Sequence, residues 1–455
     1  MNFERRPTQR TFIDLFSGCG GLSLGLCQAG WQGLFAIERA TDAFETFRAN
    51  FLRAGARYPF QWPEWLEQRA HSIDEVLDEK PNQLSRLRGK VDLIAGGPPC
   101  QGFSFAGKRS ASDPRNKMFQ RYVDFVELVR PKFLVLENVP GMNVAHKDGR
   151  GKSKQTYYQK LVESLAGIGY DVSGKVLDAA DFGVPQRRAR LVAVGIRSDI
   201  ARQFTSGGQR EASETIQSAF ALIEAAGARQ LTLYGNGRQV SASEAISDLA
   251  VGTAKKRNTQ EYVGEGARHG YRQVKYEGPT SNYQSKMSDG VSPEEMDSMR
   301  LARHREDVEQ KFATILKICR PGISLSAEMR SMLGMLKHRT VPMHRDRPAP
   351  TLTTLPDDIL HYCEPRILTV REYARIQSFP DWFKFKGKYT TGGKYRRTEC
   401  PRYTQVGNAV PPLLGQAIGD GLLSCWSPDV VAEVHSKPTA IGLAKNRALS
   451  VLVES

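Results

Sequence analysis

The chain has no long uninterrupted apolar stretch. Hydrophobic residues make up 40% of its 455 residues, but none of the apolar runs approaches the roughly 20 residues that a membrane-spanning helix needs. The first ten residues are polar and lead into an expected strand without the apolar core of a signal peptide. We therefore expect a cytoplasmic protein with no membrane partner.

The sequence also lacks paired cysteines. Its seven cysteines include no Cys-x-x-Cys pair and no cysteine–histidine cluster at zinc spacing. This scarcity argues against a disulfide framework and against a structural metal. A reduced compartment, in which a free thiolate persists, is the expected setting.

Acidic residues are too few to balance the basic ones. The chain has 64 Lys and Arg against 49 Asp and Glu, which gives a formal net charge of +15 at pH 7. This excess favours a polyanionic partner, with nucleic acid ahead of a membrane surface because no basic amphipathic helix stands out. A solvated basic face is the alternative interpretation.

What the sequence does contain is an alternation of short apolar runs with helical patterns. Strands are expected at residues 11–16, 34–37, 70–73, 91–95, 133–136, 170–177 and 191–195. Helices are expected at residues 22–29, 40–51, 118–129 and 160–167. Such alternation is typical of an α/β fold with a doubly wound, mostly parallel sheet, and the length leaves room for a smaller second domain.

A cysteine follows the apolar run 91–95 on an unusual turn. Two glycines allow the backbone to leave the strand sharply, and Pro98 and Pro99 stiffen the approach to Cys100. The pattern predicts a thiol on a rigid elbow at the carboxyl edge of the sheet, where open α/β folds place their ligands. A small buried cysteine in a tight loop is the alternative.

A glycine turn follows the first expected strand and precedes a helix. Such a turn lets a ligand lie against the backbone and the free N–H groups of the helix start. Glu38 ends the second strand, where an acid can accept hydrogen bonds from ribose hydroxyls. Ser23 replaces the last glycine of the dinucleotide pattern Gly-x-Gly-x-x-Gly, so we expect a different adenosine-containing ligand. A surface role for Glu38 is the alternative.

Two further groups of polar residues flank core strands. Glu137 stands at the carboxyl end of the expected strand 133–136, so we expect it in the same crevice as Cys100. Arg188 and Arg190 precede the strand 191–195, and arginine makes fork-like bonds to phosphates or base edges. A surface acid and an ordinary basic rim are the alternatives.

The alternation fades over residues 198–358, which are rich in glycine, polar residues and basic runs such as 255–257. We expect a separate, irregular domain there, suited to backbone phosphates. Regularity returns afterwards, with a helix that begins at the capping-box pair Thr369 and Glu372. A last helix is expected from Pro412 to about Trp426, after a turn that contains Asn408.

Six motifs, taken in chain order, resemble those of the DNA (cytosine-5) methyltransferases of the prokaryotic or phage modification type. They are Phe16–Gly21, Pro98–Gln101, Glu137–Val139, Gln186–Arg190, Arg371–Glu372 and Gln405–Pro412. The resemblance covers about residues 10–197 and 363–425. It implies a catalytic and cofactor-binding domain at 10–197, a target-recognition domain at 198–358, a return to the catalytic domain at 359–428 and a tail at 429–455.

The resemblance implies S-adenosylmethionine as cofactor, no metal, and a methyl transfer to carbon 5 of a flipped-out cytosine. Cys100 would be the nucleophile and Glu137 its acid partner, while Arg188 and Arg190 would hold the cytosine and nearby backbone. The cofactor site would comprise Phe16, Ser17, Gly18, Cys19, Gly20, Gly21, Glu38, Ile73, Pro98, Pro99, Asn408 and Val410. The family often has an acid for the adenine where this chain has Ser72, with Asp74 out of register, so the adenine contact stays open.

A polar loop over residues 101–116 would fill the gap left by the flipped base and close the site. Its expected DNA contacts are Gln101, Ser104, Lys108, Arg109 and Arg115. The implied protein is a monomer that modifies duplex DNA in a restriction-modification system, with a cognate endonuclease acting on the same site. A tRNA cytosine-5 methyltransferase, a catalytically idle DNA-binding relative and a nicotinamide dehydrogenase are the alternatives.

Overall fold

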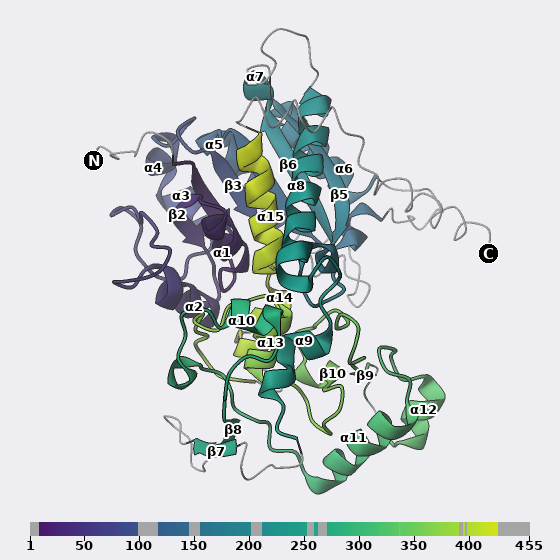
Figure 1. Cartoon of the computed structure of the whole chain (residues 1–455). Coiled ribbons are helices and arrows are strands. Elements are labelled where there is room, and N and C mark those ends of the chain that lie inside the picture. Colours follow the sequence, from purple (N-terminus) through teal and green to yellow (C-terminus); the bar gives the residue numbers. More distant parts are fainter. Residues whose placement is uncertain are drawn as a thin grey trace, which may run out of the picture.

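A six-stranded sheet organises the upper part of the molecule (Figure 1) and has the strand order β2-β1-β3-β4-β6-β5. The strands are β1 (Thr11–Leu15), β2 (Gln32–Ile37), β3 (Leu93–Gly96), β4 (Phe133–Asn138), β5 (Tyr170–Asp178) and β6 (Ala189–Arg197). Strands β1 to β4 pair in parallel, and β6 runs antiparallel to both of its neighbours, β4 and β5. The computed structural model describes residues 9–98, 117–144, 155–201, 212–252, 259–262, 271–335, 337, 339–390, 395 and 398–425.

Strands β1 to β4 and the middle of β6 are buried on both faces, which explains why they are apolar runs, whereas the edge strand β5 is largely exposed. Successive side chains of β1 illustrate this, since Phe12 belongs to one hydrophobic cluster and Ile13 to the other. The first cluster is covered by α1 (Gly21–Gln28), α8 (Ala212–Gly235) and α15 (Pro412–Ser424), and the second by α3 (Ile73–Glu79), α5 (Lys117–Val129) and α6 (Tyr157–Gly167). The predicted doubly wound, mostly parallel α/β fold is confirmed.

The last described helix packs against the first. Helix α15 lies between α1 and α8, as Figure 1 shows in yellow. A Cβ atom added at Gly25 would come within 2.3 Å of the Pro412 carbonyl oxygen, and one at Gly21 within 2.2 Å of the Val410 carbonyl oxygen. Because no side chain fits at either position, glycine permits the close approach of the two chain ends.

The prediction of a strand at residues 70–73 is wrong. Ser72 instead caps helix α3, and its hydroxyl accepts a hydrogen bond from the backbone N–H of Glu75 at 3.1 Å. Asp74 and Glu75 stand in the first turn of this helix. Serine at the cap and acids in the first turn stabilise a helix start, and here they outweigh a short apolar run.

The remaining elements form the lower part of the molecule and the connections. The remaining helices are α2 (Thr41–Phe51), α4 (Pro81–Ser85), α7 (Ser198–Ala201), α9 (Ala242–Ile246), α10 (Asn282–Met287), α11 (Glu306–Ile318), α12 (Ala327–Met332), α13 (Val370–Ile376) and α14 (Arg402–Asn408). The short strands are β7 (Thr259–Tyr262), β8 (Tyr271–Val274), β9 (Val341–Pro342) and β10 (Ile359–Leu360), and 3₁₀ turns lie at Pro140–Asn143, Ala179–Phe182, Ser247–Leu249, Pro293–Glu295 and Pro356–Asp358. Helix α8 falls within residues 198–358, the region expected to be a separate domain, but it packs on α15 and β5. The boundaries of that domain, which were expected from composition, stay a prediction.

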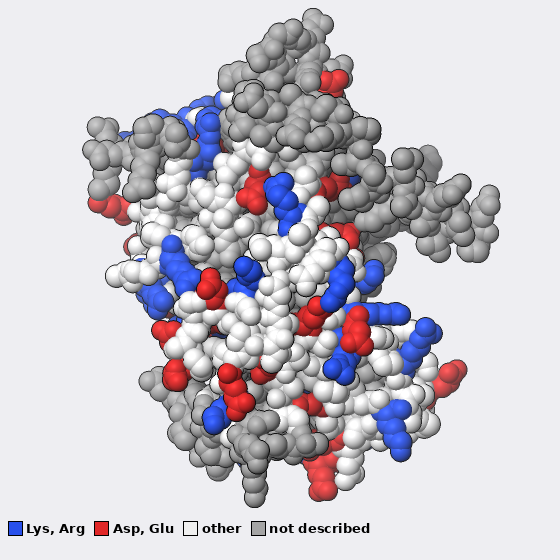
Figure 2. Space-filling model, in the orientation of Figure 1, with Lys and Arg blue, Asp and Glu red and all other residues white. Residues whose placement is uncertain are grey.

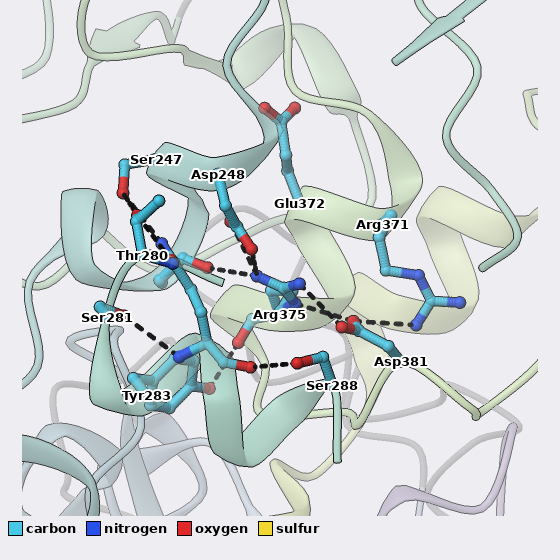
Figure 3. Close-up of polar contacts among 12 residues, drawn as sticks. Ser247, Asp248, Thr280, Ser281, Tyr283, Ser288, Arg371, Glu372, Arg375 and Asp381 are labelled. Atoms are coloured by element: carbon cyan, nitrogen blue, oxygen red, sulfur yellow. Dashed lines mark hydrogen bonds and ion pairs between the residues drawn. The ribbon is translucent and has the colours of Figure 1, made fainter. Parts of the chain in front are cut away.

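A buried ion network joins α13 to the middle of the chain (Figure 3). The Arg375 guanidinium binds the Asp381 carboxylate through two bonds of 2.7 Å and the Asp248 carboxylate at 3.0 Å. The Tyr283 hydroxyl of α10 donates to the Arg375 carbonyl oxygen at 2.6 Å. Burial, the largest influence, raises the pKa of Asp248 to about 6. Helix α13, though late in the sequence, is thus tied to residues of the predicted recognition region.

Candidate active site

The ends of β3 and β4 form the edge at which Glu137 lies. Strand β3 ends at Gly96, which pairs with Leu136, while β4 continues through Glu137 and Asn138, which pair with β6. The Asn138 side-chain amide donates to the Pro98 carbonyl oxygen at 3.0 Å, which ties the turn after β3 to β4. Pro99, Cys100, Gln101, Ser104, Lys108, Arg109 and Arg115 lie outside the described residues.

Glu137 forms an ion pair with Arg190. The Arg190 Nε lies 2.7 Å from the Glu137 Oε1, and the two side chains are 11% and 10% exposed. A Cβ atom added at Gly97 would lie 3.3 Å from the Glu137 Oε2. One carboxylate oxygen is therefore held by Arg190, and the other faces the turn that leads to Cys100.

Arg188 has a different environment from Arg190. Its buried guanidinium donates to the carbonyl oxygens of Leu352, at 3.3 Å, and Gly407, at 3.0 Å. Its backbone N–H donates to the Asp178 carboxylate at 2.9 Å. Arg188 joins the start of β6 to two later chain segments, so its contacts are those of a positioning residue.

A chain of buried amides beside Arg188 was not predicted from the sequence. The Gln186 side chain accepts from the Leu352 backbone N–H at 2.8 Å and donates to the Gln377 side chain at 2.7 Å. Gln377 in turn donates to the Val406 carbonyl oxygen at 2.7 Å. Uncharged amides carry no charge or spacing signal, although Gln186 does stand within one of the six motifs.

Glu38 is hydrogen-bonded to the backbone of the glycine turn. Its carboxylate accepts hydrogen bonds from the Gly18 N–H at 2.9 Å and from the Ala40 N–H at 2.7 Å. Burial raises the pKa of Glu38, and these two bonds oppose the shift. Glu38 directly follows β2, and the ligand contact expected of its carboxylate stays a prediction.

The backbone of the turn takes conformations that side chains rarely adopt. Phe16 has φ 61°, Gly18 has φ 56° and Gly20 has φ 96°. A non-glycine residue with positive φ, such as Phe16, is a local strain of the kind that collects at functional sites. Cys19 is buried, and its Sγ points to the Gln405 carbonyl oxygen at 3.7 Å. The Cys19 thiol therefore packs toward α14.

The far end of the chain completes this region. The carbonyl oxygen of Val410 lies against Gly21, and Asn408 is exposed at the end of α14. The structure thus brings the Gln405–Pro412 motif beside the Phe16–Gly21 motif, about 390 positions earlier in the sequence.

The third predicted cofactor segment lies beside Glu38 through its backbone. The His71 N–H donates to the Glu38 carbonyl oxygen at 2.9 Å, and Ile73 is buried at the start of α3. The carboxylate of Asp74 pairs with Arg121 of α5. The Ser72 hydroxyl caps α3. The side chains of Ser72 and Asp74 therefore both have partners within the protein.

Asp14 is a buried acid that the sequence analysis did not select. It lies on β1 with 1% exposure, and its carboxylate accepts a 2.5 Å hydrogen bond from the Ser23 hydroxyl of α1. This bond joins the strand before the glycine turn to the helix after it. Burial, reinforced by the charge of Glu38, raises the pKa of Asp14 from 3.8 to about 7.

Because the folded protein holds the Asp14 proton more tightly than the unfolded chain does, this residue should lower stability as pH rises from about 4 to about 7. The full cost above pH 7 is on the order of 4 kcal/mol. Asp14→Asn removes this titration, so its melting temperature should exceed that of the wild type more at pH 8 than at pH 5. Thermal unfolding at the two pH values measures this difference, and an equal difference at both would contradict it.

The described residues contain no group of three or more His, Cys, Asp or Glu arranged to hold a metal ion. None of the helices that are described is long and apolar enough to cross a membrane. The face shown in Figure 2 has basic and acidic side chains interspersed. On that face, the net charge of the chain does not gather into one broad basic patch.

Comparison with known proteins identifies the family. The model of the family described as C-5 cytosine-specific DNA methylase matches residues 10–424. The chain belongs to this family. The Type II methyltransferase M.DdeI of Desulfomicrobium norvegicum is 32% identical over 90% of this chain and 87% of its own length. The Type II methyltransferase M1.HphI of Haemophilus parahaemolyticus is 32% identical over 91% of this chain and 86% of its own length.

The fold has a solved counterpart. A crystal structure described as that of a DNA modification methyltransferase encoded within a prophage of E. coli has a TM-score of 0.58 to this chain, at 22% sequence identity. The match covers 91% of this chain and 98% of the other. The prediction of a DNA (cytosine-5) methyltransferase is confirmed, and the tRNA-modifying, idle and dehydrogenase alternatives are not favoured.

Proposed function

We propose that this DNA (cytosine-5) methyltransferase uses S-adenosylmethionine and acts on a flipped-out cytosine within a specific duplex sequence, as the modification enzyme of a restriction-modification system. The observation that carries the proposal is the edge shared by Glu137, Arg190 and the turn toward Cys100. The Type II naming of the relatives supports the biological setting. A cognate endonuclease acting on the same sequence, monomeric action and a cytoplasmic location belong to the same proposal.

Cys100 is the proposed nucleophile. Pro98, two positions before Cys100 in the sequence, is held by the Asn138 side-chain amide next to Glu137 at the end of β4, and this supports the assignment. A thiolate that adds to carbon 6 of cytosine pushes electron density onto carbon 5, and it can leave again by elimination after carbon 5 loses its proton. The target carbon is inaccessible inside a stacked duplex, so the base must leave the helix at a cost of a few kcal/mol.

Glu137 is the proposed acid partner, and Arg190 holds it in place. A carboxyl group hydrogen-bonded at ring nitrogen 3 neutralises the charge that builds on the ring during thiolate attack. The ion pair with Arg190 uses one carboxylate oxygen and fixes the side chain, so the other oxygen is available toward the Gly97 turn. Arg188 acts through the backbone that it joins.

The residues of the glycine turn fit S-adenosylmethionine. Gly18 and Gly20 allow close backbone approach to a ligand, and α1 begins at Gly21 without a side-chain cap at its N-terminus. Glu38 lies where a ribose could be bound, and Asn408 and Val410 close the region from the other side. When bound, this cofactor supplies an electrophilic methyl group to carbon 5.

The decisive assay measures transfer of radiolabelled methyl from S-adenosylmethionine to duplex DNA and to total transfer RNA. Label in DNA, followed by mapping of the modified cytosines with bisulfite sequencing, is the expected result, and it gives the target sequence. Label only in RNA would overturn the proposed substrate. No label in either, with duplex DNA still bound, would favour the idle relative.

A further inference from the structure

Arg300 lies between two tyrosine rings in the middle region of the chain. Its guanidinium carbon is 3.2 Å from the centre of the Tyr271 ring and 4.8 Å from that of Tyr389. The guanidinium carbon of Arg402 also lies over the Tyr389 ring, 4.5 Å from its centre. Arginine and tyrosine therefore alternate in the order Tyr271, Arg300, Tyr389 and Arg402. Tyr271 begins β8, and Arg402 begins α14.

The backbone that carries Arg300 is fixed from both sides. Residue 300 bridges Gln273 of β8, the Val274 N–H donates to the Met299 carbonyl oxygen at 3.1 Å, and the Leu301 N–H donates to the Arg272 carbonyl oxygen at 2.8 Å. Met299 is buried in a cluster with Leu249, Val251, Val274 and Tyr276. Since side chains alternate along an extended segment, Arg300 points away from that cluster.

The residue before this segment is strained and firmly held. Ser298 has φ 64°, its carbonyl oxygen accepts from the Arg371 N–H at 3.1 Å, and its hydroxyl accepts from Arg402 at 3.1 Å. Arg371 also binds Asp297 and faces Asp381, which belongs to the buried network of Figure 3. A strained backbone persists only where its surroundings determine it, so the position of Arg300 is set by the buried core beneath it.

The N–H donors of the Arg300 guanidinium set it apart from the arginines around it. The partly exposed side chain makes no hydrogen bond or ion pair to any of the described residues, and its guanidinium carbon lies over two tyrosine rings. Stacking fixes the plane of a guanidinium and leaves its N–H donors pointing outward in that plane. By contrast, Arg371, Arg375 and Arg402 nearby donate to protein oxygens.

We propose that Arg300 is a specificity or anchoring residue for duplex DNA, which presents its fixed fork of N–H donors to two neighbouring acceptor atoms of the duplex. This inference rests on the proposed function. Two sources supply such a pair of acceptors, namely O6 and N7 of a guanine in the major groove and two oxygens of a phosphate. Because the side chain is already held by its stack, little rotamer freedom is lost on binding.

The test compares wild type with Arg300→Gln, which keeps a planar polar group between the rings, and with Arg300→Ala. The control is Arg305→Ala, a matched removal of an arginine that is 81% exposed and pairs with Asp307. Each protein methylates the same plasmid, the modified cytosines are mapped by bisulfite sequencing, and duplex affinity is measured from 50 to 200 mM salt. The melting temperature of each Arg300 variant is measured first, and the variant that melts at the wild-type temperature is used for the comparison.

A guanine contact predicts a consensus relaxed at one position, with discrimination there reduced roughly 10- to 100-fold. A phosphate contact predicts unchanged sites, uniformly weaker binding and a salt slope smaller by about 1. Either result supports the proposal, and replacement of one guanine by 7-deazaguanine confirms the first. An Arg300 variant that matches Arg305→Ala in consensus, affinity and salt slope would overturn it. If the wild type itself leaves the plasmid unmethylated, the proposed function fails instead.

Discussion

Replacing Cys100 by alanine should abolish methyl transfer while leaving duplex binding nearly unchanged. Without a thiolate, no group can add to carbon 6, and carbon 5 of cytosine stays too poor a nucleophile to accept the methyl group. Alanine removes only the sulfur, so contacts to the DNA backbone, which supply most of the affinity, should persist. Single-turnover transfer of radiolabelled methyl and a duplex-binding titration measure the two properties.

The matched control is Cys363→Ala, because Cys363 is an exposed cysteine elsewhere in the chain. We expect this variant to keep wild-type turnover. A covalent complex gives an independent readout: a duplex containing 5-fluorocytosine at the mapped target should trap the wild type and Cys363→Ala in denaturing gels but not Cys100→Ala. Methyl transfer by Cys100→Ala above background would contradict the nucleophile assignment.

Much of the sheet could be predicted because most of its strands are buried on both faces. Such strands read as short apolar runs, and those at 11–16, 91–95, 133–136 and 191–195 match β1, β3, β4 and β6. Ser72 shows the limit of this approach, since a short apolar run and a helix cap compete for the same residues. The direction of β6, antiparallel to β4, depends on pairing between distant segments and leaves no local signal.

The site was predictable in its chemistry but not in its contacts. Glu38 was expected at the end of the second strand as a ribose contact, and in the structure its carboxylate oxygens accept hydrogen bonds from the Gly18 and Ala40 N–H groups. Arg188 and Arg190 are alike in sequence, but one joins buried carbonyl groups and the other pairs with Glu137. Which arginine goes where depends on Leu352 and Gly407, and such long-range partners cannot be read from local patterns.

Glu137→Gln should lower the rate of the methyl-transfer step by 10² to 10⁴-fold, the usual contribution of a positioned acid or base. Glutamine fills nearly the same volume, but its amide cannot supply or accept the proton and loses the charge that Arg190 holds at 2.7 Å. Cofactor binding and duplex binding should change little, because Glu137 faces the turn after β3 while the glycine turn is held by Glu38. Single-turnover rates at saturating cofactor isolate the chemical step. The control is Glu224→Gln, which removes an exposed acid paired with Lys175 and should leave the rate unchanged.

A second substitution, at Arg190, tests whether Arg190 acts by holding Glu137 or by a contact of its own. If Arg190 acts chiefly by holding Glu137, then Arg190→Gln should slow the wild type but have a much smaller effect in the Glu137→Gln background. Additive effects would instead indicate that Arg190 contacts the DNA or the cytosine on its own. A Glu137→Gln enzyme with a wild-type single-turnover rate would remove Glu137 from the chemistry, and the ion pair with Arg190 would then be only a structural link between β4 and β6.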